Sequence, residues 1–290
     1  MLGRMKRRLL RRHRDVRCII GDVEIVLPPE HALPEHRALF ALYDVALGDI
    51  AQSVVELDEA ALGVDIGANV GDSAAVIRSR CAMPLVCIEV DHLYFEYLRR
   101  NAQKIGGLTL INAAVGLEDQ TVAGEIRREA GTAAIVDGTL QLRTRRLSDL
   151  LTDARVDLQR VKLVKIDTDG YDFDVLMGSR DILESQRPSL FFEYLVTDER
   201  SLAESVAVVQ LLDSYGYRFI VYDNYGNTLA AVTRDIPERM AEISRFLLSS
   251  QTNGGGVGYA DIFATVDDKL FALVARRGEA RVVGKHAADV

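Results

Sequence analysis

Two polar stretches of the chain carry residue types that bind and activate small molecules, and the first follows an apolar run at residues 62–66. It contains Asp65, Gly67 and Gly71 ahead of an amphipathic segment, which predicts a strand, a tight turn and a helix. Glycines let the backbone approach a ligand closely, and the free N–H groups of the helix bind an anionic group such as a carboxylate. A second apolar run ends in Glu89, which would lie at the same sheet edge and accept hydrogen bonds from a ribose diol. The expected ligand is a nucleoside with a charged tail.

Two nucleoside cofactors fit that description, and the loop distinguishes them. A dinucleotide fingerprint requires glycine at positions 69 and 72, where this chain has Asn69 and Asp72. Asp65 would also repel a pyrophosphate. S-adenosylmethionine has no phosphate, and its ammonium and sulfonium groups are attracted by acids, so the loop favours S-adenosylmethionine over NAD. A nicotinamide-dependent oxidoreductase and a non-catalytic nucleoside-binding module of the same fold remain the alternative functions.

A third strand, at residues 108–111, runs into small residues that would leave room for an adenine ring against the backbone. Asn112 could bond the edge of that ring. The predicted cofactor-binding residues are Asp65, Gly67, Ala68, Asn69, Gly71, Asp72, Ser73, Glu89, Val90, Asn112, Ala113 and Ala114.

The second polar stretch supplies candidates for catalysis. Asp167 and Asp169 follow a strand at residues 161–166, and Glu193 lies in the next strand. A reaction that removes a proton from its substrate benefits from a positioned base, so we expect Asp167 or Asp169 to be that base and Glu193 to orient the acceptor. The same three carboxylates could instead hold Mg²⁺, which prefers oxygen ligands. We favour the base without a metal.

Strands and helices alternate along the chain, which predicts a doubly wound α/β sheet. We divide the chain into a basic arm (residues 1–17), a cover segment (18–60) and a main domain (61–290). The cover should contain a strand pair at 18–29 and a helix at 34–52. Residues 117–146 should form a polar, turn-rich loop that is flexible around Gly131 and ends in an edge strand from residue 140.

Charge and cysteine content limit the partners and the compartment. The net charge is −8, yet the basic arm carries eight Lys and Arg residues against Asp15 alone. An acidic body argues against nucleic acid as a substrate, whereas the arm could make weak contact with an anionic membrane surface. The three cysteines suit a reduced cytoplasm, and no stretch is apolar enough to span a bilayer. The oligomeric state cannot be predicted.

The ordered set of motifs resembles FkbM-type S-adenosylmethionine-dependent methyltransferases. The similarity covers residues of about 60–195 and rests on V-D-I-G-A-N-V-G-D, I-E, T-R-R-L-S-D-L, K-I-D-T-D-G-Y-D and F-E, in that order. The resemblance implies a Rossmann-like class I methyltransferase fold, whose seven-stranded sheet has a reversed final strand. It also implies O-methylation of a sugar, glycan or secondary metabolite. Asp169 and Asp172 depart from the family, which usually has Glu at both positions.

Overall fold

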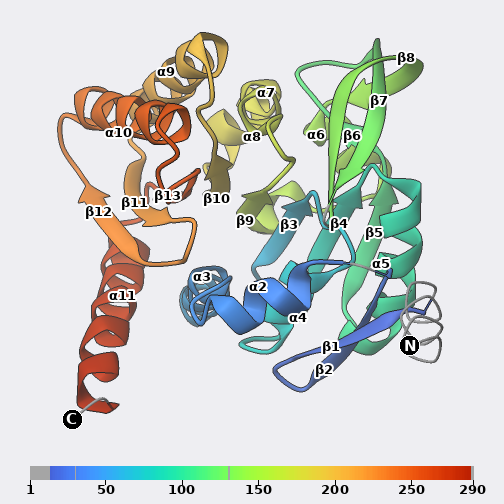
Figure 1. Cartoon of the computed structure of the whole chain (residues 1–290), viewed down its shortest axis with the longest axis horizontal. Coiled ribbons are helices and arrows are strands. Elements are labelled where there is room, and N and C mark those ends of the chain that lie inside the picture. Colours follow the sequence, from blue (N-terminus) through green and yellow to red (C-terminus); the bar gives the residue numbers. More distant parts are fainter. Residues whose placement is uncertain (1–13, 30, 130, 289–290) are drawn as a thin grey trace, which may run out of the picture.

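A computed structural model of the chain describes residues 14–29, 31–129 and 131–288. Eight strands form its central sheet (Figure 1). In chain order they are β3 (Leu62–Ile66), β4 (Leu85–Glu89), β5 (Leu108–Asn112), β9 (Val161–Ile166), β10 (Ser189–Tyr194), β11 (Arg218–Asp223), β12 (Thr228–Val232) and β13 (Ala260–Thr265). Across the sheet the order is β12-β11-β13-β10-β9-β3-β4-β5.

The sheet confirms the predicted topology and adds one strand to it. Strands β5, β4, β3, β9 and β10 run parallel, and β13 is antiparallel to both of its neighbours, β10 and β11. These seven strands match the expected sheet with its reversed final strand. The eighth strand, β12, pairs antiparallel with β11 at the sheet edge. Sequence analysis missed it because the strand is short and mostly exposed, so its residues lack a clear apolar pattern.

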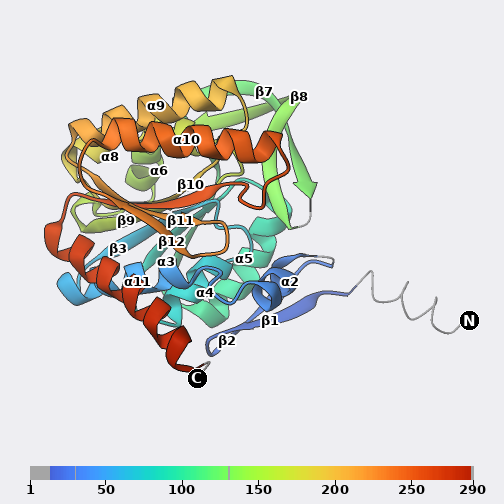
Figure 2. The same cartoon turned by 60° about the vertical axis from the view of Figure 1, so that its left-hand side comes forward.

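Helices cover both faces of the sheet (Figures 1 and 2). One face carries α6 (Leu147–Asp153), α7 (Asp172–Gly178), α8 (Arg180–Ser185), α9 (Glu199–Ser214) and α10 (Ile236–Thr252). The other face carries α3 (Val45–Leu57), α4 (Asp72–Arg78), α5 (His92–Ile105) and α11 (Asp268–Ala288). Two hydrophobic clusters result, and in several strands alternate residues enter different clusters: in β10, Leu190 and Phe192 face one and Phe191 the other. Burial on both faces explains why these strands are nearly continuous apolar runs.

The cover segment packs on the second face. Strands β1 (Val16–Ile20) and β2 (Val23–Leu27) form the expected antiparallel hairpin. The single helix expected at 34–52 is wrong: α2 (Leu33–Leu39) and α3 are separate helices, and Asp44 before α3 has a left-handed φ of 58°. A residue in the left-handed region cannot continue a right-handed helix, so α3 starts only after Asp44. Most of the predicted basic arm, residues 1–13, lies outside the described residues.

Residues 117–146 differ most from expectation. They form a ribbon of two long antiparallel strands, β7 (Gln120–Glu129) and β8 (Thr132–Arg145), with β6 (Ala114–Val115) pairing to β8. The expected loop around Gly131 is the turn of this ribbon, and the expected edge strand is the last part of β8. Small, polar and charged residues interrupt the apolar ones along β7 and the first part of β8, so apolar alternation is weak and sequence analysis does not find these strands. A short 3₁₀ helix, η1 (Leu158–Arg160), precedes β9. Within the described part of the chain, every helix is too short or too polar to cross a membrane.

The side chain of Asn101 ties the cover hairpin to the sheet domain and offers a test of this packing. Buried in α5, Asn101 accepts a hydrogen bond from the Val26 N–H (2.8 Å) and donates to the carbonyl oxygens of Val26 (2.9 Å) and Val70 (2.8 Å). Asn101→Ala leaves three buried backbone groups without a partner. We expect the free energy of unfolding in urea to fall by about 2–4 kcal/mol. Asn253→Ala, at the exposed end of α10, should change it by about 0.5 kcal/mol or less, and equal losses would contradict this account.

Candidate functional site

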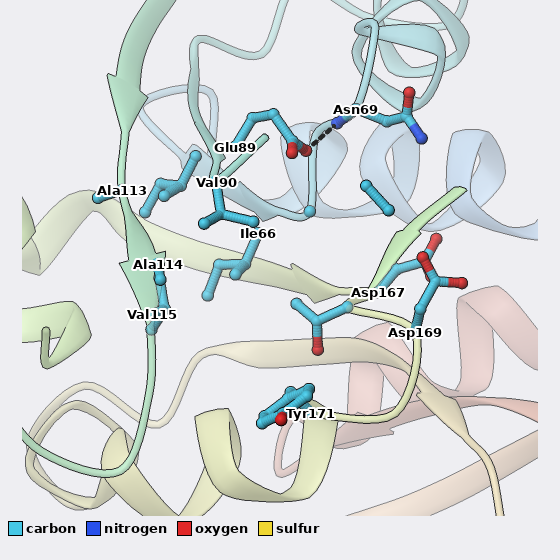
Figure 3. A pocket seen from close by; sticks show the side chains of 14 residues that line it. Ile66, Asn69, Glu89, Val90, Ala113, Ala114, Val115, Asp167, Asp169 and Tyr171 are labelled. Carbon is cyan, nitrogen blue, oxygen red and sulfur yellow. Dashed lines mark hydrogen bonds between the residues drawn. The ribbon is translucent and has the colours of Figure 1, made fainter. Parts of the chain in front are cut away.

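A cleft of about 510 Å³ opens at the carboxyl ends of β3, β4 and β9, and we call it the first cleft (Figure 3). Six of the predicted cofactor-binding residues line it: Gly67, Asn69, Glu89, Val90, Ala113 and Ala114. Asp167, Asp169 and Tyr171 lie across the cleft from the two alanines. The parallel sheet therefore brings four separate segments of the chain to one cavity, as expected for this edge.

Gly67 allows the loop after β3 to pack against the loop after β9. Its φ is +76°, and a Cβ at this position would lie 1.8 Å from the carbonyl oxygen of Asp167. The Gly67 N–H also donates to the carbonyl oxygen of Ile88 at 2.9 Å, as does that of Ala68 at 3.0 Å. Any side chain at position 67 would push the two loops apart.

Glu89 fixes the backbone on two sides of the first cleft. Its Oε2 accepts a hydrogen bond from the Asn69 N–H at 2.7 Å (Figure 3), and its Oε1 accepts one from the Asp91 N–H at 2.7 Å. Burial raises the pKa of Glu89 to about 7, although both backbone N–H groups oppose that rise. A carboxylate oxygen can accept a second hydrogen bond, so a ligand hydroxyl can still bind here.

Beneath the glycine loop, a buried ion pair joins β3 to β9. Asp65 is fully buried, its Oδ2 accepts from the Ser73 hydroxyl at 2.5 Å, and its Oδ1 lies 3.1 Å from the Lys165 ammonium. The Lys165 Nζ also donates to the Gly67 carbonyl at 3.1 Å and lies 3.3 Å from Asp167. Burial disfavours the charged amine, but the surrounding carboxylates outweigh it and hold the pKa of Lys165 well above its ordinary value. Asp65 therefore supports the loop from below.

The loop after β9 carries both candidates for the base. Asp167 has a half-exposed side chain and lines the first cleft. Asp169 has a φ of +52° and accepts a hydrogen bond from the Ala133 N–H of β8, while burial and the nearby Asp167 raise its pKa to about 6. Asp172 accepts from the Thr168 N–H (3.2 Å) and hydroxyl (3.0 Å). It thus holds the loop in shape rather than capping α7.

The turn of the β7–β8 ribbon closes over one side of the first cleft. The Asn69 amide donates to the Gly131 carbonyl at 2.7 Å, and the Tyr94 hydroxyl donates to the Thr132 carbonyl at 3.3 Å. Arg128 pairs with Asp91 at 2.7 Å. The sequence suggested that residues 117–140 help to build the acceptor pocket, whereas Ala133 of this ribbon lines the first cleft.

A second cleft, of about 580 Å³, adjoins the first and is formed by the α2–α3 loop, β9, β10, β11 and β13. Asp167 lines both clefts, whereas Glu193 lines the second together with Asp44 and Asp261. Burial and neighbouring carboxylates raise the pKa of Asp44 to about 7 and those of Glu193 and Asp261 well above the ordinary value. The structure therefore does not bring the predicted trio of Asp167, Asp169 and Glu193 into one cavity. Asp167 connects the two clefts.

The remaining predicted cofactor residues lie around the first cleft. Ala68 is fully buried and Gly71 precedes α4 with a φ of 89°. Asp72 and Ser73 line a neighbouring cavity with His31. The Asn112 amide donates to the carbonyl oxygens of Glu89 (2.7 Å) and Val90 (3.3 Å), so it braces the β4 end.

Asp261 and Asp44 are site residues that sequence analysis did not select. Asp261 lies opposite both Glu193 and Tyr222 in the sheet register, which only the strand order reveals. Asp261 lies at the start of β13, which is antiparallel to β10, so an acid at the start of a reversed strand is the signal that could have identified it. Among the described residues, no group of three or more His, Cys, Asp or Glu side chains is arranged to hold a metal ion.

The buried carboxyl groups of the site predict how stability depends on pH. The pKa values of Asp44, Glu89 and Asp172 are about 7, mainly because of burial, against about 4 in an unfolded chain. Each of these groups binds its proton more tightly in the folded chain, which adds to the free energy of unfolding. This contribution is complete below about pH 4 and is lost as the pH rises through about 7. Urea unfolding should show a free energy that decreases between about pH 5 and about pH 8, with a shallower decrease for Glu89→Gln. A free energy that increases over this interval would contradict the assignment.

Comparison with known proteins assigns the chain to a family. Residues 65–219 match the methyltransferase FkbM domain, a span of more than half of the chain. No curated protein matches the chain. Its fold is similar to that of the methyltransferase FkbM from Methylobacillus flagellatus KT (14% identity, TM-score 0.37), with 70% of this chain and 43% of that chain covered. This chain thus spans less than half the length of that protein.

Two further solved structures are similar at the same level. The precorrin-6y C5,15-methyltransferase from Geobacter metallireducens GS-15 has 14% identity and a TM-score of 0.39, with 75% of this chain and 86% of that chain covered. The tRNA (uracil-54, C5)-methyltransferase from Pyrococcus abyssi, in complex with S-adenosyl-L-homocysteine, has 12% identity and a TM-score of 0.38, with 86% and 43% covered. The match over residues 65–219 and the sheet order agree, and the chain belongs to the FkbM methyltransferase family, with a Rossmann-like class I methyltransferase fold.

Proposed function

We propose that the protein transfers a methyl group from S-adenosylmethionine to a hydroxyl group of a small molecule or glycan. The observation that carries this proposal is the position of Asp167, which lines both clefts. The first cleft would hold the methyl donor and the second the acceptor. A base at their junction is in reach of the atom that loses a proton as it gains the methyl group.

The first cleft has the chemical groups that the donor requires. Glu89 has spare acceptor capacity for ribose hydroxyls. Ile66, Val90 and Val115 offer apolar surface for the adenine ring, beside the small side chains of Ala113 and Ala114. Asp167 and Asp169 place negative charge where the cationic end of the donor would lie. The same acids would repel a pyrophosphate, which favours this donor over a dinucleotide.

When bound, the donor supplies a methyl group on a sulfonium, which is already a good leaving group. The acceptor oxygen forms a bond to the methyl carbon, the carbon–sulfur bond breaks with its electron pair staying on sulfur, and Asp167 accepts the hydroxyl proton. Alignment of the reacting atoms can lower the barrier by about 7–11 kcal/mol. Lys165 holds the Asp167 carboxylate from one side and already supplies a positive charge there, so we favour a base without a metal. Asp169 would shape the donor side, and Glu193 the acceptor side.

Binding of the donor product tests the first cleft. Calorimetry should show that S-adenosylhomocysteine binds the full chain and that NADH does not. Glu89→Ala should weaken S-adenosylhomocysteine binding by about tenfold to a hundredfold, because a charged hydrogen-bond acceptor is lost. Glu118→Ala, which removes an exposed carboxylate next to the β7 strand, is the matched control and should leave the affinity unchanged. Binding of NADH alone would overturn the choice of cofactor.

The base is tested separately from binding. Asp167→Asn keeps the shape of the side chain and removes its basicity, so tritiated methyl transfer to a hydroxyl-rich metabolite extract should fall by about 100-fold or more. S-adenosylhomocysteine affinity should remain within about threefold of wild type, because this product lacks the sulfonium charge and Asp169 still lines the cleft where its ammonium would lie. Asp213→Asn, exposed on α9, should transfer at the wild-type rate. Unchanged transfer by Asp167→Asn would remove this residue from the role of base.

A further inference from the structure

The second cleft holds more carboxyl groups than its own cation can balance. Four of its lining side chains are carboxyl groups: Asp44, Asp167, Glu193 and Asp261. Lys165 is the only lysine or arginine among the described residues that line it. The Lys165 ammonium is already engaged with Asp65 at 3.1 Å and Asp167 at 3.3 Å. Burial and neighbouring carboxyl groups keep the pKa values of Glu193 and Asp261 well above their ordinary values, and a cation bound beside them would favour their ionised form.

Two oxygen atoms of the cleft are buried without a hydrogen-bond donor. Within the described structure, Glu193 Oε2 and Asn224 Oδ1 have no partner, and both residues line the cleft. A buried acceptor left in this state costs about 1–3 kcal/mol. Glu193 and Asp261 are direct partners across the β10–β13 pair, so their side chains extend from adjacent strands on one face of the sheet. A ligand that supplies several donors and a positive charge would satisfy this set.

Aromatic rings complete the lining. Tyr43 and Tyr259 line the same cleft. The nearby Asp44 and burial raise the pKa of Tyr43, and burial together with Asp261 raises that of Tyr259, so both phenols stay neutral at physiological pH. Neutral tyrosine rings attract cations through their faces.

We propose that the second cleft binds the acceptor through a protonated amine, so that the methyl acceptor is a hydroxylated amine such as an amino sugar. This inference rests on the proposed function, because it takes the second cleft as the acceptor site. The hydroxyl group would lie at Asp167 and the ammonium near Glu193 and Asp261. An ammonium group has three donors and no acceptor, which fits both the charge and the two unpaired oxygens.

Other occupants fit these features less well. A neutral polyol supplies donors but no positive charge that would favour the ionised form of the buried carboxyl groups, and an anionic acceptor would disfavour that form further. A divalent cation requires converging ligands, and the described His, Cys, Asp and Glu residues form no such group of three. An organic cation can bind carboxyl groups that are further apart than the ligands of a metal ion, because the cation is larger and has several hydrogen-bond donors.

The test compares two sugars that differ in charge. Glucosamine carries an ammonium, and N-acetylglucosamine keeps the ring but replaces the ammonium with a neutral amide. Each is titrated by calorimetry into the full chain saturated with S-adenosylhomocysteine. We expect glucosamine to bind at least about tenfold more tightly, as for a charge-assisted hydrogen bond. Asp261→Asn should reduce this preference to about threefold or less, whereas the exposed Asp213→Asn should retain it.

The outcomes separate this inference from the proposed function. Glucosamine that binds no more tightly than N-acetylglucosamine, including the absence of measurable binding by either, overturns the amine proposal. A preference that persists unchanged in Asp261→Asn overturns it as well. Failure of S-adenosylhomocysteine to bind wild-type protein would instead overturn the proposed function. Unchanged S-adenosylhomocysteine affinity and circular dichroism in Asp261→Asn show that the variant is folded.

Discussion

The buried ammonium of Lys165 is the contact on which the arrangement of the site depends. It reaches the carboxylate of Asp65 in β3, the Gly67 carbonyl in the glycine loop and the carboxylate of Asp167 after β9. Removing a single partner from such a set leaves an uncompensated buried charge, which costs several kcal/mol. The strands are therefore held in a register that brings the two loops together. Both clefts form against these loops.

Asp167 and the residues after it form the boundary between the clefts. Three interactions hold this segment. The Asp172 carboxylate accepts hydrogen bonds from Thr168. The Ala133 N–H of the ribbon donates to Asp169, and Lys165 forms an ion pair with Asp167. The two clefts thus share a boundary that is held by several contacts, which would suit the proposed reaction because it depends on alignment. Elements that reach only the second cleft, such as the α2–α3 loop and β11, can differ in sequence without altering the first.

The sequence predicted the features that depend on local pattern. Strands β3, β4, β9 and β10 are apolar because both of their faces are covered. Each also has an acidic residue within one position of its carboxyl end. These two patterns made the sheet and Glu89 recognisable in the sequence. Strand β7, the first part of β8 and β12 were missed because they carry little apolar alternation. The split between α2 and α3 depends on the left-handed backbone of Asp44, which an aspartate rarely adopts. Asp261 became a site residue only through strand order, which no local pattern shows.

The two backbone hydrogen bonds of Glu89 have a thermodynamic consequence. Because the N–H groups of Asn69 and Asp91 already hold the carboxylate, the side chain is confined to one rotamer before any ligand arrives. Ordering a glutamate side chain costs up to about 2 kcal/mol in conformational entropy. The side chain loses this entropy when the protein folds, so binding of a nucleoside at Glu89 would not reduce it again.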